Sequence, residues 1–252
     1  MELRYVQGIR LGALTFDPVG RVENAFWTHR PLRRQPARQT LASAPLAQTW
    51  GDVLGVPFGG SVVAGGFRLE LVPSGYGPGG AAVIATLNGA RTMVLGPVTG
   101  ACEAQPVDVL VLYAPEPVRE DFDWLQAAQL GNTLRLVPRD VGAALAVSRS
   151  LTAAGIPHHR PGWLTPAEGE GSRKARVHIA LSGEGTVIDA RPQVDEAWLV
   201  HFARSTGAER VYVHGARAEA LAGRLKEAGI PSRTLMAPAQ LPLAGLYPAN
   251  SL

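Results

Sequence analysis

The sequence predicts an α/β fold, because its hydrophobic pattern changes from strand-like in the first half to alternating strand-like and helical in the second. The first hundred residues contain short apolar or alternating runs of about five to eight residues between glycines and prolines, a pattern typical of β-strands. In the second half, strand-like runs alternate with amphipathic helical ones, which indicates α/β layering. With 252 residues, 46% of them hydrophobic, the chain is long and apolar enough to bury a substantial core.

The strands expected in the first half are bounded by turn residues. RYVQGIRLGALTFDP alternates apolar and polar positions and ends at the turn signal Asp17-Pro18, and VENAFWTH follows as a short strand. The spacing in QTLASAPLAQTWGDVLG predicts a short helix before Gly55. Asn88-Gly89 predicts a hairpin turn, and the run VDVLVLY predicts a strand buried on both faces.

The second half contains three expected helices. The first extends from about Val141 to Ala153 and is closed by Gly155 and Pro157. A loop, HHRPGWLTPAEGEGSRKA, follows it. VDEAWLVHFARSTG then predicts an amphipathic helix, ERVYVHG a buried strand and ARAEALAGRLKEAGIP another helix, before a tail that we expect to be irregular.

Composition limits the function classes. There is no apolar run near 18 residues and no signal-peptide pattern, so we expect a soluble, cytoplasmic protein without membrane partners. The single cysteine, Cys102, excludes an internal disulfide and a thiolate-rich zinc site. The net charge of +3 is a modest excess for a nucleic-acid-binding protein. Arginine outnumbers lysine, which suits phosphate recognition but is equally explained by a GC-rich coding sequence.

One C-terminal segment and several upstream motifs show a resemblance to a known family. VDEAWLVHFARSTGAERVYVHGARAEALAGRLKEAGIP and, further upstream, the Thr-His strand end, the PSGYGPGGA loop, TMVLGP and VDVLVLY follow one another in a familiar order. In this layout, roughly from Gly8 to Pro231, the chain resembles metallo-β-lactamase-fold nucleases of the β-CASP type. The nearest groups are the ligase-associated DNA exonucleases and the mRNA 3′-end-processing exonucleases.

The resemblance implies a particular architecture. It is a metallo-β-lactamase-like αββα four-layer sandwich, built from residues 1–117 and 176–243, with a reduced β-CASP-like insert at residues 118–175. Residues 244–252 are then an irregular tail. In the family the insert clamps nucleic acid over the active site, and the interval here is short for that task.

The family's metal ligands are almost all replaced. The resemblance places the first histidine of a His-x-His-x-Asp-His cluster at His29, the histidine of a Val-His-Gly motif at His214, and the aspartate of a Ser-x-His-x-Asp motif at Asp195. The remaining ligand positions are occupied by residues of other types, namely Pro31, Arg33, Arg34, Tyr76, Pro97, Tyr113 and Gln193. Two isolated imidazoles cannot hold a pair of metal ions. We therefore expect no metal, no cofactor and no surviving catalytic residue. His29, His214 and Asp195 are then vestiges, and we expect the two histidines to be satisfied by hydrogen bonds.

The same region contains the candidate binding residues. Arg30, Arg33, Arg34 and Arg38 suit the phosphates of a nucleic acid, or alternatively form a solvated loop that pairs with carboxylates. The candidate pocket residues are Tyr76, Tyr113 and Gln193. The two tyrosines either stack on bases, together with Trp27, or fill the emptied metal pocket.

Three functions follow as hypotheses. The first is a catalytically inactive homologue that binds DNA or RNA, or acts as a scaffold beside an active nuclease paralogue or another repair or RNA-processing protein. The alternative is a hydrolase with mononuclear or metal-independent chemistry around His29 and His214. The third is a structural subunit, which predicts an exposed apolar patch.

Overall fold

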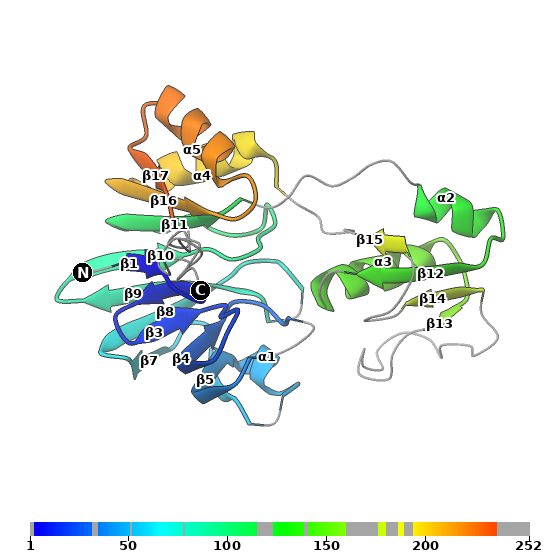
Figure 1. The fold of residues 1–252 in the computed structure, drawn as a ribbon, viewed down its shortest axis with the longest axis horizontal. Coiled ribbons are helices and arrows are strands. Elements are labelled where there is room, and N and C mark those ends of the chain that lie inside the picture. The colour runs from blue at the N-terminus through cyan, green and yellow to red at the C-terminus, as the bar shows by residue number, and fades with distance from the viewer. Residues whose placement is uncertain are drawn as a thin grey trace, which may run out of the picture.

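The computed structural model describes residues 3–31, 35–50, 52–77, 79–114, 123–138, 141–159, 176–179, 186–188 and 194–235. Figure 1 shows two sheets stacked on each other, with helices α4 and α5 beside one of them and α1 beside the other, and a smaller unit to the side. The molecule therefore has the α/β character that the sequence predicts.

The N-terminal sheet has six strands within the described residues, in the order β1-β2-β3-β4-β5-β6. β1 to β3 pair antiparallel, whereas β3 to β6 pair parallel. The strands are β1 (Leu3–Tyr5), β2 (Ile9–Leu11), β3 (Leu14–Phe16), β4 (Val22–Trp27), β5 (Ala37–Ser43) and β6 (Leu54–Val56).

The second sheet has seven described strands, in the order β17-β16-β11-β10-β9-β8-β7. Strands β7 to β10 pair antiparallel, and β10, β11, β16 and β17 pair parallel. The strands are β7 (Ser61–Ala64), β8 (Phe67–Pro73), β9 (Ala81–Leu87), β10 (Ala90–Val94), β11 (Val109–Tyr113), β16 (Arg210–His214) and β17 (Ser232–Thr234).

Hydrophobic clusters define four layers. One cluster joins inward residues of both sheets, such as Phe26 and Val83, so the sheets pack face to face. A second joins the other face of the seven-stranded sheet to α4 (Glu196–Thr206) and α5 (Ala218–Glu227). A third joins the outer face of the six-stranded sheet, including Trp27, to α1 (Ala44–Ala47). Each sheet is thus covered on its outer face by helix.

The smaller unit has its own sheet and core. Its strands run in the order β13-β14-β12-β15, all parallel, and their inner residues cluster with α2 (Trp124–Gln129) and α3 (Val141–Ala153). The strands are β12 (Leu134–Pro138), β13 (His158–His159), β14 (Val177–Ile179) and β15 (Thr186–Ile188). The predicted boundary at residue 175 is therefore too early, because β14 and β15 hydrogen-bond to β12 in this sheet.

Most expected elements lie where the sequence places them. Asn88 and Gly89 have φ of 50° and 83° between the antiparallel strands β9 and β10, as the predicted hairpin turn requires. β11 is buried along nearly its whole length, and α3 has the predicted bounds. The helix expected before Gly55 is an exception, because only Ala44–Ala47 are helical. Gln39–Ser43, expected at its start, extend β5 instead, where Gln39 to Ala42 pair with β4 and Ser43 pairs with β6.

Candidate functional site

Asp17, Thr28 and His29 form a hydrogen-bonded group at one end of the six-stranded sheet. Asp17 follows β3 and Thr28 follows β4, and because these strands run parallel, their carboxyl ends meet at one edge. The Thr28 amide donates to Asp17 Oδ1 at 2.8 Å, and the Thr28 hydroxyl donates to Asp17 Oδ2 at 2.5 Å. The same hydroxyl lies 3.1 Å from His29 Nδ1. Thr28 thus connects the carboxylate to the imidazole.

Burial controls the electrostatics of this group. The side chains of His29 and Asp17 are only 18% and 16% exposed, and His29 Nδ1 lies 3.6 Å from Asp17 Oδ1. Desolvation raises the pKa of the Asp17 carboxyl above its ordinary value, while the neighbouring His29 and the two hydrogen bonds from Thr28 oppose that rise. Asp17 also has a φ of 44°, a left-handed conformation that aspartate tolerates better than most residues.

His214 lies at the end of β16, beside the end of β11. Tyr113 and His214 are partners in the register of these parallel strands, and their ring centroids are 5.2 Å apart. The centroid of the Tyr5 ring lies 6.2 Å from that of His214. Nε2 of His214 is buried without a hydrogen-bond partner among the described residues, and desolvation lowers the pKa of this imidazole to about 4. We expected a histidine satisfied by hydrogen bonds; His214 is instead a neutral ring between two phenols.

Tyr5 lies near His214 and is also influenced by the charge of Asp17. Burial raises its pKa, and both Tyr113 and Asp17 raise it further through their charges, which places the phenol near both groups. The structure thus brings the ends of β1, β3, β4, β11 and β16 to one region. Sequence reasoning missed Tyr5, Asp17 and Thr28 as site residues.

Of the three predicted pocket residues, the two tyrosines lie beside different histidines. Tyr76 follows β8, is only 3% exposed, and meets the His29 ring edge-on at a centroid distance of 6.1 Å. Tyr113 lies against His214 as described. Gln193 lies outside the described residues. Aromatic rings therefore lie next to both histidines.

Gly96, from the side of the seven-stranded sheet, lies against Thr28 and Asp17. It lies just beyond β10, and a Cβ atom on it would collide with the Thr28 hydroxyl and come within 2.9 Å of Thr28 Cβ and 3.3 Å of Asp17 Oδ2. The next residue is Pro97, where the resemblance places a bridging aspartate. A residue without a side chain is therefore required where the two sheets approach each other.

The arginines differ in their surroundings. Arg30 is partly buried, which lowers the pKa of its guanidinium below the ordinary value. Arg38 lies on β5 with its side chain 84% exposed, 3.6 Å from Glu23 Oε1. Arg33 and Arg34 lie outside the described residues. Pairing with a carboxylate, one of the two alternatives for this cluster, thus applies to Arg38.

Asp195 has a structural role in the described chain. Its carboxylate accepts a hydrogen bond from the Trp198 amide at 2.7 Å and caps the N-terminus of α4. The next residue, Glu196, forms ion pairs with Arg217 at 2.7 Å and Arg224 at 2.9 Å, both of α5 or its cap. This end of α4 is thus held by capping and by its neighbour helix.

The donor set does not fit the two metal ions that the resemblance implies. Within the described ranges, no three His, Cys, Asp or Glu side chains gather in a way that could hold a metal ion. Asp17 and His29 are joined through Thr28, and His214 faces two phenols. Cys102 is buried, and burial raises the pKa of its thiol to about 12.

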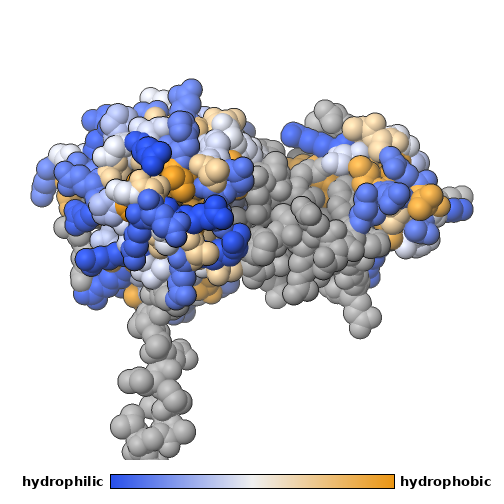
Figure 2. Space-filling view, turned by 90° about the horizontal axis from the view of Figure 1, so that it is seen from above, coloured by the Kyte–Doolittle hydropathy of each residue, from blue (hydrophilic) through white to orange (hydrophobic). Residues whose placement is uncertain are grey.

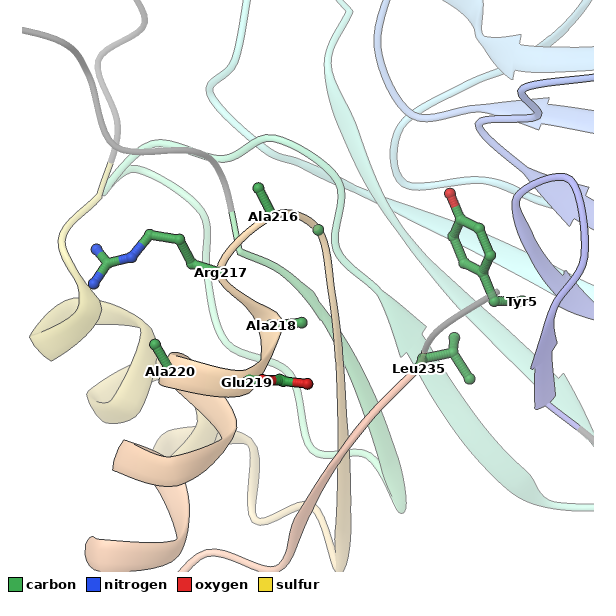
Figure 3. A pocket seen from close by; sticks show the side chains of 8 residues that line it. Tyr5, Ala216, Arg217, Ala218, Glu219, Ala220 and Leu235 are labelled. Atoms are coloured by element: carbon green, nitrogen blue, oxygen red, sulfur yellow. The ribbon is translucent and has the colours of Figure 1, made fainter. Parts of the chain in front are cut away.

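A pocket opens next to the site. It has a volume of about 560 Å³ and lies between Tyr5, Leu235 and the turn that leads from β16 into α5, residues 215–220. Figure 3 shows Tyr5 across the pocket from this turn, with the Arg217 side chain directed away toward α4. Its walls are therefore mostly small and apolar side chains.

Comparisons with known proteins add little. No protein-family model matches the sequence, and no curated protein matches it either. Among solved structures, one similar chain is a protein of unknown function from Enterococcus faecalis V583, with 11% sequence identity and a TM-score of 0.40. That match covers 84% of this chain and 69% of the other. In the described part of the chain, no helix is both long and apolar enough to cross a membrane.

Proposed function

We propose that the chain is a non-catalytic relative of the metallo-β-lactamase-fold β-CASP nucleases that binds nucleic acid, or acts as a scaffold, in DNA repair or RNA processing. The observation that carries this proposal is the environment of the two remaining histidines. His29 contacts the hydroxyl of Thr28, which donates a hydrogen bond to the buried Asp17. His214 lies against the rings of Tyr5 and Tyr113.

The layers and the separate small unit support the family part of the proposal. Two face-to-face sheets with helices on their outer faces agree with an αββα sandwich, and a small α/β unit follows β11, where the family has its insert.

The chemistry of the site supports the non-catalytic part. A dinuclear hydrolase needs two sets of ligands around a bridging water whose pKa the metals lower. Two imidazoles, one of which belongs to a hydrogen-bonded His-Thr-Asp group, supply too few ligands for that arrangement.

Metal analysis and a nuclease assay on the purified chain test the proposal. We expect less than one equivalent of bound metal after dialysis, and no cleavage of end-labelled single-stranded DNA or RNA with added Zn²⁺ or Mn²⁺. His214→Ala provides the control, because contaminating nuclease activity would survive that substitution. Two tightly bound metal equivalents, with cleavage that His214→Ala abolishes, would overturn the proposal.

Nucleic-acid binding is tested separately by fluorescence anisotropy over a salt series. If the arginines after β4 contact phosphates, the double charge reversal Arg33→Glu, Arg34→Glu weakens binding and lowers the slope of log K against log salt by about one per lost contact. Arg149→Glu, on the exposed side of α3, is the matched control. Equal affinity of the doubly reversed variant and the wild type would exclude phosphate binding by these arginines, and a chain that binds neither DNA nor RNA would leave the scaffold role alone.

One observation favours a hydrolase as the second candidate. If Thr28 donates its hydroxyl proton to Asp17, its oxygen accepts from a protonated Nδ1 of His29, which leaves Nε2 of His29 as a base. This candidate predicts esterase or phosphodiesterase activity that is lost in His29→Ala. Activity in His29→Ala equal to wild type would exclude it.

A further inference from the structure

Two histidines lie side by side at the edge of the small sheet. His159 on β13, the edge strand of the described sheet, is the register partner of His178 on β14, and these two strands run parallel. Their ring centroids are 5.5 Å apart, with an angle of 41° between the ring planes. The two imidazoles are therefore in contact on one face of the sheet, and we call them the histidine pair.

The histidine pair lies on the face of the sheet opposite α3. Val177 and Ile179, the neighbours of His178 on β14, pack into the core that contains α3 residues, and successive residues of a strand point to opposite faces. His178 therefore points away from the helix. Both residues of the pair remain partly exposed, so an ion in solution can reach them.

A third histidine, His158, fixes the strand that carries His159. Its Nε2 lies 2.8 Å from the hydroxyl of Ser148 on α3, and its Nδ1 lies 3.0 Å from the carbonyl oxygen of Ile156. With Nδ1 protonated, the ring donates to the carbonyl and accepts from the serine. Both ring nitrogens of His158 are thus used in anchoring β13 to α3, and His159 is held beside His178 on the other face.

The ring nitrogens of the histidine pair differ from those of His158. Within the part of the chain that the structure describes, each ring of the pair contacts the other, and neither takes part in a hydrogen bond or an ion pair. Arg135, the register partner of His178 on its other side, already makes an interaction of its own, and a guanidinium has no acceptor to offer an ion. The pair therefore presents two imidazoles that can each supply a nitrogen ligand.

The spacing of the two rings suits one metal ion held between them. A zinc ion lies about 2.0–2.1 Å from a ligating imidazole nitrogen and prefers tetrahedral angles, so two imidazoles on one ion have ring centroids about 5.2 Å apart. The observed separation of 5.5 Å is close to that value. Small rotations of the two side chains are therefore enough to direct one nitrogen of each ring at the same ion.

We infer that His159 and His178 form a binding site for one divalent transition-metal ion, with water completing its coordination. Imidazole suits Zn²⁺, Ni²⁺ and Cu²⁺, whereas Mg²⁺ and Ca²⁺ prefer oxygen ligands. No third His, Cys, Asp or Glu ligand joins the pair within the described ranges, so the affinities should follow the general order for these metals, with Cu²⁺ bound most tightly. The exposed charge of Arg135 on the next strand opposes a cation, but water and salt screen it.

This site is independent of the proposed function and of the two metal ions that the resemblance implies. It lies on the small unit, whereas His29 and His214 belong to the sandwich. Because only two protein side chains hold the ion, dialysis removes it, and the site is observed by titration. A bound ion connects β13 to β14 and stabilises this edge by mass action, since it binds the folded sheet.

Metal titrations of the full chain, without a polyhistidine tag and at neutral pH, test the inference. Zn²⁺ is added while the imidazole signals of the six histidines are followed by NMR, and Cu²⁺ binding is followed by calorimetry and by EPR, which reports the number of nitrogen ligands. The variants are His159→Gln and His178→Gln, which keep a polar side chain. The matched control is His201→Gln, which removes an exposed imidazole from α4, and Mg²⁺ is the control ion.

We expect Zn²⁺ to shift the His159 and His178 signals selectively and Mg²⁺ to shift neither. Each variant of the pair should weaken Zn²⁺ and Cu²⁺ binding by at least about tenfold, because the second imidazole no longer binds the same ion, while His201→Gln binds as the wild type does. If one variant of the pair unfolds, the other decides, since each removes one ligand. No metal binding to the wild type, or equal affinity in the wild type and the folded variants, would overturn the site and leave the proposed function standing. Shifts of His29 and His214 in place of the pair would overturn both.

Discussion

At the scale of single residues, Thr28 holds the candidate site together. It is 1% exposed, donates to both Asp17 oxygens and contacts His29. Thr28→Val keeps the shape and the amide donor but removes the hydroxyl, so a buried carboxylate loses one hydrogen bond. We expect the free energy of unfolding to fall by about 1–3 kcal/mol in urea titrations. In a double-mutant cycle with Asp17→Asn, additive losses would show that the two side chains do not interact.

His214 makes stability depend on pH. Burial lowers its pKa in the folded chain to about 4, below the ordinary value of 6.5, so the unfolded chain binds more protons between these values. Stability is then fully present above pH 6.5 and is lost as the pH falls toward 4. We expect His214 to contribute a loss of about 2 kcal/mol between pH 7 and pH 5.

Denaturant titrations of the wild type and of His214→Gln at both pH values isolate this contribution from that of Asp17. The raised pKa of Asp17 acts in the opposite direction, but it is present in both proteins. If the wild type and the variant lose the same stability on acidification, His214 titrates normally.

Sequence reasoning selected candidate site residues by their motif positions and did not select residues whose position depends only on the fold. His29, Tyr76, Tyr113 and His214 were selected from motif positions, and the structure places them in two contacting pairs, His29 with Tyr76 and Tyr113 with His214. From the sequence, Asp17 was assigned only to a turn, and Tyr5 only to a strand. Their roles depend on strands β1, β3 and β4 ending at one edge, which local sequence patterns do not encode.

At the scale of elements, substitutions of Asp195 test how much its N-cap stabilises α4. Asp195→Ala removes the acceptor for the Trp198 amide and should lower the free energy of unfolding by about 1 kcal/mol. Asp195→Asn keeps an acceptor oxygen and should stay near the wild type. Thermal and urea unfolding of the three proteins compare them, and equal losses in both variants would point to the charge of Asp195 rather than its cap.

The three longest helices of the described chain were the easiest elements to predict. α3 has its predicted bounds, and α4 and α5 lie in the segments expected to be helical. The helix before Gly55 was predicted too long, because the apolar spacing of residues 39–43 also suits a strand, and pairing with β4 decides between them. β14 and β15 were assigned to the larger unit because a three-residue strand contains no information on its partner.

At the scale of the whole molecule, the separate cores predict separate effects on stability. Leu136 belongs to the cluster of the small unit, whereas Phe26 belongs to the cluster between the two large sheets. Leu136→Ala should cost about 2–5 kcal/mol and raise amide exchange mainly in α2, α3 and β12. Phe26→Ala should raise exchange in both large sheets. Exchange that rises throughout the chain in Leu136→Ala would mean that the two units unfold together.

The third hypothesis, a structural subunit, predicted an apolar patch. The large hydrophobic residues that are exposed in the described chain lie on separate elements, among them Val19, Leu54, Val63 and Leu130. Figure 2 shows hydrophilic and hydrophobic residues interspersed on the face of the sandwich that it presents. A docking face made of these residues is therefore not evident in that view.

The small unit is also an insertion whose two ends join the sandwich in the same region. The chain leaves after Ala114 and returns at Val194, and both residues pack in the cluster beneath α4 and α5. Of the residues between them that the structure describes, none belongs to the core between the large sheets or pairs with β11 or β16. A gene that joins Ala114 to Val194 through a short glycine-serine linker should therefore encode a shortened protein that folds as the sandwich alone and keeps the contact between Tyr113 and His214.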